Sequence, residues 1–483
     1  MKCHYLLLVA LCGVGSTAVA APVITLEQAL QSTRQNNISW KSLSEVLKQA
    51  DAGRDMGIGL LLPKLQAQGQ WVHMGERNVP DLSSMTDGTA QLVEVLGTLT
   101  RVVVEEHPNR IADFLPYLNQ QESSGGDENV FESFVPPADT LSATFSVIVP
   151  VLNPKGITTL QGAYDRYDAA VQQIGYGRDQ LLFGVCKAYY GLATLQGLID
   201  AAGRSVDAGR ANFESKRVKA GLQAATQLEV KRAELELAQA EARRVDLQAD
   251  LKRTKSTFRY LTGIEGEFDV VVPEAPPLEQ ANTVDLWIDE AKRQRRDLTA
   301  ARISVKASER DVLGGWFGYL PTVDLIGQAK LDNAEEQRFD DDPFSWNILG
   351  TLTWNLYDGG ISQANLSVTQ SRRRQAELTV LDLEHSIVNQ VVAAEQSLRD
   401  AVLARELAEG AVSVARDAAK LTEAAEAAGA VTSLEVIDVN NAVFQSEAGL
   451  LAAQLREAMA RLDLFAAAGQ AVPFGDAAAP EGG

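Results

Sequence analysis

The sequence is poor in cysteine, histidine and positive charge. Its 483 residues include 3 cysteines and 4 histidines, and 64 Asp and Glu outnumber 44 Lys and Arg, which gives a net charge of -20. This acidic balance argues against a broad basic face for a phosphate backbone, so we expect no nucleic-acid partner. The histidines form no His-Glu-x-x-His pattern, and the sequence has neither a phosphate-binding Gly-Lys loop nor a Gly-x-Ser-x-Gly elbow. We therefore expect no enzymatic activity, no catalytic residues, no cofactor and no metal site.

Long apolar runs are missing beyond the amino terminus. The first 20 residues combine Lys2 with a short apolar stretch and end in Ala18-Val19-Ala20, a pattern typical of a cleaved signal peptide. A membrane anchor is the alternative, but the apolar stretch is shorter than a membrane span. Cleavage would leave Cys186 as the one cysteine, so packing rather than an internal disulfide must hold the fold. Without a later apolar run of membrane length, an α-helical inner-membrane protein is excluded.

Proline is absent from two long stretches, 155–272 and 344–472, so nothing in them must break a helix. Both are rich in Ala, Leu, Glu, Gln, Lys and Arg, which favour helix. They predict long helical hairpins over about 157–262 and about 361–469, with a first arm of roughly 95 Å at ~1.5 Å per residue. Hairpins of this kind also occur in soluble coiled coils, so composition alone does not decide the function.

The order of features is duplicated. Leu62-Pro63 matches Leu320-Pro321 before an alternating stretch, and Leu228-Glu229-Val230 matches Leu434-Glu435-Val436 within each hairpin. Repeats of this length indicate two large halves and not a solenoid of small units. The predicted divisions are a signal peptide (1–20), a first repeat (21–262), a linker or equatorial segment (263–283), a second repeat (284–470) and a flexible tail (471–483).

Four segments alternate apolar and polar residues, which predicts strands with one apolar face. They cover about 64–72, 141–152, 321–331 and 346–357. Strands of about ten residues can cross a bilayer when tilted, although a half-buried sheet in a soluble sandwich gives the same pattern. Ile326 is an exception to the alternation. Four strands are too few to close a barrel, and an open edge in lipid leaves backbone groups unpaired, so membrane strands would require a cyclic homo-oligomer.

The first pair of strands encloses an insertion. Pro63 and Leu152 are 89 residues apart, whereas the matching Pro321 and Leu356 are 35 apart. The inserted loop, about 73–140, has apolar periodicity in its middle. We expect a partly helical extracellular loop.

The sequence resembles the TolC-like outer-membrane efflux proteins in three features. They are the duplicated order, the strand exit Trp354-Asn355-Leu356-Tyr357-Asp358-Gly359-Gly360, and the segment from Gly429 to Asn441. The resemblance covers nearly the whole mature chain. It implies a mostly α fold with a membrane β-barrel portion, in which duplicated αα-hairpin and β-hairpin halves form a homotrimer. Twelve strands would then make one barrel, continued by a long α-helical periplasmic tunnel.

The same resemblance implies a passive exit duct in the outer membrane of a Gram-negative bacterium, extending into the periplasm and surrounded by outer-membrane lipid. Such a duct serves tripartite efflux or type I secretion after docking with a periplasmic adaptor (membrane-fusion) protein and an inner-membrane RND or ABC transporter. The alternative function is a soluble periplasmic coiled-coil adaptor or structural tether.

Acidic side chains ring the periplasmic constriction in that family, and the resemblance places Glu435 and Asp438 there. The two are three residues apart on one helix face, and a trimer would bring six such carboxylates around its axis, favouring cations. Acidic pairs at this spacing are also common on solvated helix faces. Glu229 is the first-half counterpart. Val431 stands where family members often have a basic residue that helps to lock this end.

Gly221 and Gly429 lie where each hairpin must reverse, and glycine tolerates the positive φ that such a turn can require. These hairpin tips are candidates for contact with the adaptor. They could equally be helix caps.

Overall fold

The computed structural model describes residues 22–73, 139–271, 273, 283–332, 344–428 and 430–474. The predicted signal peptide, most of the inserted loop and of the tail, and Gly429 lie outside these residues. The chain divides into a helical unit (1–58, 155–317 and 358–483) and a strand unit (59–154 and 318–357). Each unit is described by itself.

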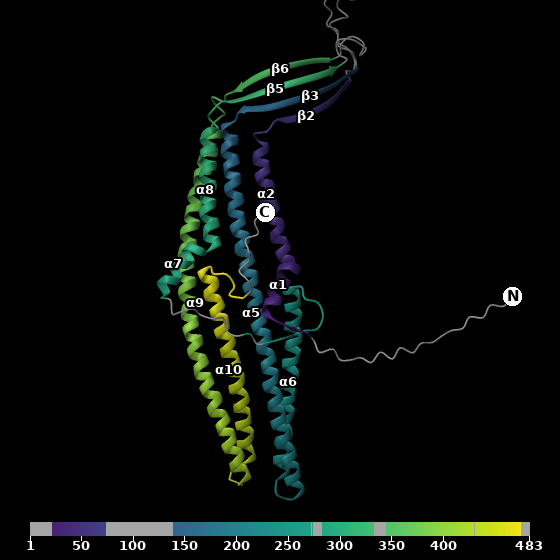
Figure 1. Cartoon of the computed structure of the whole chain (residues 1–483), viewed down its shortest axis with the longest axis vertical. Coiled ribbons are helices and arrows are strands. Elements are labelled where there is room, and N and C mark those ends of the chain that lie inside the picture. Colours follow the sequence, from purple (N-terminus) through teal and green to yellow (C-terminus); the bar gives the residue numbers. More distant parts are fainter. Residues whose placement is uncertain are drawn as a thin grey trace, which may run out of the picture. The chain divides into compact units, whose positions relative to one another are not determined.

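The helical unit contains two long hairpins and several short helices. Its elements are β1 (Val23–Ile24), α1 (Leu26–Asn36), α2 (Ile38–Gly59), α5 (Pro154–Gly221), α6 (Gln227–Thr262), β4 (Asp269–Val270), α7 (Val284–Gln294), α8 (Arg296–Phe317), α9 (Ile361–Ala427) and α10 (Ser433–Ala468). The outgoing arms α5 and α9 have 68 and 67 residues, and the returning arms α6 and α10 have 36 each. Figure 1 shows the two hairpins turning at the same end of this unit. The two halves thus repeat each other in helix length.

Local sequence explains where the helices start and stop. Thr25 and Gln28 form a capping box at the start of α1, in which each side chain accepts a hydrogen bond from the other residue's backbone N–H. Gly263 and Gly469 end α6 and α10 in the left-handed conformation, with φ of 69° and 75°. A Cβ atom at Gly263 would lie 2.6 Å from Cβ of Asn36, so this position requires glycine for space as well.

The core of the helical unit lies where the hairpins meet the short elements. The ring of Phe258 packs between those of Tyr189 and Phe268, with centroids 6.0 and 5.7 Å away. The Tyr189 hydroxyl donates to the carbonyl oxygens of Ile24 and Val271, at 2.8 and 3.0 Å. It thereby holds the parallel pair of β1 and β4 against α5.

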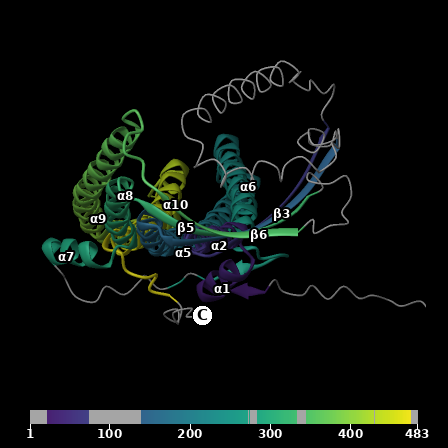
Figure 2. The same cartoon turned by 90° about the horizontal axis from the view of Figure 1, so that it is seen from above.

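The strand unit is one antiparallel sheet in the order β2-β3-β5-β6. Its strands are β2 (Lys64–His73), β3 (Asp139–Leu152), β5 (Thr322–Asp332) and β6 (Phe344–Thr353). Figure 2 shows the four strands curving together as a single layer. The strand predicted at about 346–357 corresponds to β6, which begins two residues earlier and ends four residues earlier. Beyond Thr353 the indole N–H of Trp354 donates instead to the carbonyl oxygen of Tyr319, at 3.0 Å.

The predicted mostly α class is confirmed, with 75% of the structure helical. Among the described residues, none of the helices combines the length and the apolar character needed to cross a membrane.

Candidate functional site

The register of the sheet brings the apolar positions of all four strands onto one face. Across the sheet, Leu65 is opposite Val147, Val147 is opposite Gly327, and Gly327 is opposite Ile348. This apolar face consists of Leu65, Ala67, Gly69 and Trp71 of β2, Leu141, Ala143, Phe145, Val147 and Val149 of β3, Val323, Leu325, Gly327, Ala329 and Leu331 of β5, and Phe344, Trp346, Ile348, Gly350 and Leu352 of β6. Leu65 is 81% exposed and Ile348 67%. So large an uncovered apolar surface indicates contact with lipid or protein.

The opposite face of the sheet is mainly polar. It carries Gln66, Gln68, Gln70, Ser142, Thr144, Ser146, Gln328, Lys330 and Asn347. Ile326, the exception in the sequence pattern, belongs to this face. It is opposite Ile148 on one side and Leu349 on the other, so three aliphatic side chains form a single row across an otherwise polar surface.

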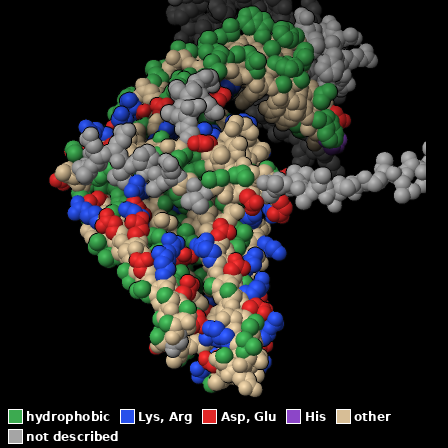
Figure 3. Space-filling view, turned by 60° about the horizontal axis from the view of Figure 1, so that its bottom comes forward, with side chains coloured by type: hydrophobic (Ala, Val, Ile, Leu, Met, Phe, Trp, Pro, Cys, Tyr) green, Lys and Arg blue, Asp and Glu red, His purple; other side chains and the backbone are tan. Residues whose placement is uncertain are grey.

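Aromatic residues lie at both ends of the apolar face. Trp71 and Phe344 are at the end nearer the inserted loop and are 67% and 55% exposed, and Trp354 and Tyr357 follow β6 at the other end. Aromatic girdles of this kind mark the two interfaces of a membrane. Figure 3 shows hydrophobic side chains gathered over the sheet, whereas charged side chains gather over the helical hairpins.

Both edges of the sheet are open in the single chain. Strands β2 and β6 each pair along one side only among the described residues. An unpaired edge is a template for another strand. The sheet can therefore be extended at either edge by further copies of the chain.

The two hairpin tips are built alike. The backbone N–H of Thr226 donates to Glu229 Oε2 at 2.7 Å, and that of Thr432 donates to Glu435 Oε2 at 2.6 Å. Hydrogen bonds from Thr226 lower the pKa of Glu229. Glu229 and Glu435 are thus equivalent third residues of the returning helices, and each carboxylate helps to cap its own helix.

The two tip glycines are not equivalent to each other. Counted from the capping boxes, Gly221 corresponds to Ala427, and Gly429 corresponds to Gln223. Gly221 is the last residue of α5, and the positive φ of that turn, 57°, belongs to Gln223. Gly221 itself therefore does not adopt the positive φ of this turn. Gly429 itself lies outside the described residues.

Glu435 and Asp438 are both exposed on the first turns of α10. Among the described residues, the carboxylate of Asp438 has no hydrogen bond or ion pair. The structure places Glu435 and Asp438 together near the tip of the α9–α10 hairpin. Glu229 lies at the tip of the other hairpin, formed by α5 and α6.

A partly buried charge cluster joins the two hairpins near their tips, and sequence reasoning missed it. Lys216 of α5 is 2.7 Å from Glu426 of α9, and Lys219 is 3.3 Å from the same Oε1 atom. Burial acts to raise the pKa of Glu426, but hydrogen bonds and charge attraction from the two lysines outweigh it, so this pKa is lowered. The two lysines of this cluster come from α5, whereas position 431 carries a valine.

A second cluster joins three helices farther from the tips. Glu447 of α10 accepts hydrogen bonds from Arg204 of α5 at 2.6 Å and from Arg416 of α9 at 2.7 Å. Burial opposes ionisation of Glu447, but both arginines favour it, and the net effect lowers its pKa. These contacts fix α5, α9 and α10 relative to one another.

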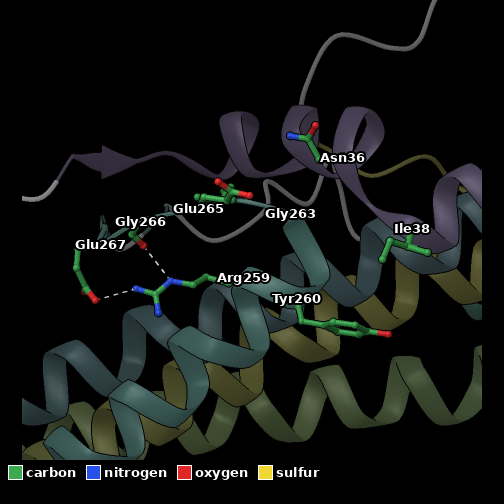
Figure 4. Close-up of a pocket in the computed structure, with 9 residues that line it drawn as sticks. Asn36, Ile38, Arg259, Tyr260, Gly263, Glu265, Gly266 and Glu267 are labelled. Atoms are coloured by element: carbon green, nitrogen blue, oxygen red, sulfur yellow. Dashed lines mark hydrogen bonds and ion pairs between the residues drawn. The ribbon is translucent and has the colours of Figure 1, made fainter.

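A shallow hollow of about 680 Å³ lies beside the end of α6 (Figure 4). Arg259 reaches across it, donating to the Gly266 carbonyl oxygen and to Glu267, both at 2.9 Å. Ile38 and Tyr260 are largely exposed at its margin. Because its arginine is already paired, the hollow offers little to an anionic ligand. In the part of the chain that the structure describes, no group of His, Cys, Asp or Glu could hold a metal ion.

Comparison with known proteins finds similarity to outer-membrane efflux proteins. Residues 287–470 match the sequence model of the family described as outer membrane efflux protein. The chain is 26% identical over 256 residues to outer membrane protein OprJ of Pseudomonas aeruginosa, covering 51% of this chain and 52% of OprJ. It is 21% identical over 322 residues to outer membrane protein TolC of Escherichia coli, covering 62% of this chain and 64% of TolC. The matched stretch therefore spans less than two thirds of either relative.

The fold likeness extends further along the chain. The outer membrane protein VceC of Vibrio cholerae matches with a TM-score of 0.68 and 16% identity, over 92% of this chain and 96% of VceC. The resemblance to the TolC-like outer-membrane efflux proteins is confirmed. The relatives of this TolC-like chain are named as outer-membrane proteins and channels, not as enzymes.

Proposed function

We propose that this TolC-like chain is the outer-membrane exit duct of a tripartite efflux or type I secretion system. The main support for this proposal is the sheet. One of its faces is apolar and lies between two sets of aromatic residues, and the other face is mainly polar. Among the described residues, both of its edges are open. This is the arrangement of a strand set that faces lipid outside and water inside. The cell location that follows is the outer membrane of a Gram-negative bacterium, with the hairpins in the periplasm.

The open edges favour a homotrimer with a shared barrel of twelve strands. Pairing β6 of one copy with β2 of the next would leave no unpaired edge in lipid, where each unpaired backbone group costs several kcal/mol. Such head-to-tail contacts close into a ring.

The hairpins favour the same assembly. On α9 an exposed apolar stripe runs through Leu403, Leu407, Val414 and Leu421, and on α6 another runs through Leu228, Leu235 and Val245. Their spacing, mostly sevens with one step of four and one of ten, is close to that of coiled-coil seams. In a ring of copies, α9 of one chain would cover α6 of its neighbour and form the wall of a helical tunnel.

The duct would carry out no reaction of its own and would conduct passively. Its energy would come from an inner-membrane RND or ABC transporter, joined to the duct by a periplasmic adaptor that contacts the hairpin tips around Gly221 and Gly429. Glu435 and Asp438, with Glu229, would line the periplasmic constriction. A soluble coiled-coil adaptor or tether is not favoured, because it would leave the apolar face of the sheet without a function.

Extraction of membranes tests this proposal. The expressed chain should remain with the outer membrane after a carbonate wash and should be released only by detergent, because the sheet face lies in lipid. A washed-off chain would contradict the duct and favour the tether. The purified wild-type protein should also conduct ions across a planar lipid bilayer.

A further inference from the structure

The hollow of about 680 Å³ beside the end of α6 lies where that helix meets the start of α2. Asn37, just before α2, donates from its side chain to the carbonyl oxygen of Leu261 at 2.6 Å. Ile38 and Tyr260 at the margin are 75% and 74% exposed. Tyr260 follows Leu235 by 25 residues, close to seven turns, so both lie on one face of α6. The hollow therefore opens on the side of the exposed α6 stripe.

The exposed stripe on α9 becomes polar at His385 and Asn389. These two residues precede Leu403 and Leu407 by 18 residues each, about five turns, so all four share one helix face. Leu378, seven residues before His385, is apolar again and 65% exposed. Among the described residues, neither the His385 nor the Asn389 side chain has a hydrogen bond or ion pair. The apolar face of α9 is thus interrupted by two exposed polar side chains without partners in their own chain.

The hairpin tips give a common reference for the positions of the hollow and of this polar interruption. The hollow begins at the end of α6, 35 residues from Gln227, which is roughly 53 Å from the tip at ~1.5 Å per residue. Asn389 and His385 are 38 and 42 residues before the end of α9 at Ala427, roughly 57 and 63 Å from the tip. If α9 of one copy runs beside α6 of the next, its polar interruption lies opposite the hollow.

The charges of the hollow complement this interruption. Arg259 is paired with Glu267 at 2.9 Å, so these two side chains cancel in charge. Glu265 is exposed, and among the described residues its carboxylate has no hydrogen bond or ion pair; Figure 4 shows it apart from the paired arginine. A carboxylate accepts hydrogen bonds, and an imidazole N–H donates them. The hollow therefore offers an acceptor where α9 offers a donor.

We propose that the hollow is a socket for α9 of the next copy, in which the His385 imidazole donates a hydrogen bond to the Glu265 carboxylate of its neighbour. The inference rests on the proposed function, which sets α9 beside α6 of another copy, and it adds a defined polar contact to that apolar seam. A separate protein could fill the socket only by displacing α9 from the adjoining seam. Apolar seams can slip lengthwise, whereas one polar contact fixes their register. The socket would set the relative height of neighbouring copies.

Exchanging the two charges tests the contact. His385→Glu places a carboxylate opposite Glu265, and like charges facing each other across an interface should weaken association of the trimer about tenfold or more. Glu265→Lys in the same chain restores opposite charges and should recover most of the loss. Both positions are exposed in the single chain, so neither substitution disturbs its core. Gln375→Glu adds an acid to an exposed position of α9 ten residues from His385, about 80° round the helix, and should leave association unchanged.

Native mass spectrometry of a dilution series in detergent measures the fraction of trimer, and conductance in planar bilayers is recorded on the same samples. The socket predicts loss of trimer in His385→Glu and recovery in the exchanged double variant. A loss no larger than that of Gln375→Glu, or no recovery on exchange, would overturn the socket, while a trimeric and conducting wild-type protein would leave the proposed function intact. A monomeric wild-type protein that does not conduct would overturn the proposed function and the socket together.

Discussion

At the scale of single residues, Glu426 is the acid that joins the hairpins near their tips, where it pairs with Lys216 and Lys219. Glu426→Gln would leave Lys216, whose side chain is 6% exposed, without its charged partner. We expect a local loss of about 2 kcal/mol, the typical contribution of a hydrogen bond to a charged group. Hydrogen exchange should show faster opening of α5 and α9 near their tips. Glu423→Gln removes an exposed acid one turn away and should leave the exchange unchanged.

The charge clusters also predict a dependence on pH. The pKa values of Glu426 and Glu447 are lowered from an ordinary value of 4.5, so the folded state favours their ionised forms. Their contribution to stability is full above the unfolded value and is lost as the pH falls through the lowered folded values. Protection of the hairpins from hydrogen exchange, after correction for the intrinsic pH dependence of amide exchange, should thus be high at neutral pH and fall below about pH 4. If Glu447→Gln shows an acid transition as large as that of the wild-type protein, this glutamate does not contribute.

The proposed constriction can be tested without losing the helix cap. Glutamine at position 435 can still form a capping box with Thr432, so Glu435→Gln together with Asp438→Asn removes charge but keeps α10 in place. In planar bilayers we expect a weaker preference for cations. Glu406→Gln, which removes an exposed acid on α9 far from the tip, should leave selectivity unaltered. Unchanged selectivity in the double variant would remove both carboxylates from the constriction.

Some residue features could be read from the sequence and others could not. The capping boxes follow from Thr and Glu at a spacing of three, a local signal that also aligns Glu229 with Glu435. The contact of Lys216 with Glu426 joins residues 210 positions apart, so only packing of the two hairpins reveals it. The two turn glycines could not be aligned by residue identity. Counted from the capping boxes, Gly221 corresponds to Ala427, so the spacing of the helices decides which positions are equivalent.

At the scale of elements, the exposed stripes on α6 and α9 predict a seam between copies. Val245→Cys with Leu407→Cys should form disulfide-linked dimers and trimers under mild oxidation, because both positions lie on the stripes proposed to meet. They are also at similar heights, roughly 27 and 30 Å from the hairpin tips at ~1.5 Å per residue. The natural Cys186 should not interfere: burial raises its pKa to about 12, so little of it is thiolate at neutral pH.

The products are measured on denaturing gels without reductant. Each single variant should remain uncrosslinked between α6 and α9, and Asp246→Cys, next to the stripe on α6, should crosslink less with Leu407→Cys. Equal crosslinking from both α6 positions would show that the stripes do not meet.

The elements themselves were largely readable from the sequence, for physical reasons. Proline-free stretches rich in helix formers predicted the hairpins, and alternation predicted strands near the observed β2, β3 and β5. The end of β6 was not readable, because Trp354 continues the alternation, but the ladder ends at the pair of Thr322 and Thr353, beyond which Pro321 has no backbone N–H to donate. The aliphatic row of Ile148, Ile326 and Leu349 required the register between strands.

At the scale of the whole molecule, the open sheet predicts that detergent-purified protein has the mass of three chains. Sedimentation with a correction for bound detergent, or native mass spectrometry, measures it. The chain contributes four described strands, and three copies supply the twelve that the proposed barrel contains. A stable monomer that stays soluble without detergent would contradict both the trimer and the membrane face. From the sequence alone, the assembly could be inferred only because one chain has too few strands to close a barrel. The contacts between copies are not encoded in any one segment.

The pairing of β1 with β4 has a practical consequence for anyone who handles this protein. Val23 and Ile24 form their strand almost at the predicted start of the mature chain, and the Tyr189 hydroxyl donates to the Ile24 carbonyl oxygen. An affinity tag or fluorescent fusion placed directly before Val23 would crowd this two-strand ribbon. Trimming through Thr25 would strip Tyr189 of one acceptor and α1 of its cap. Affinity tags for purification should therefore be placed after residue 474.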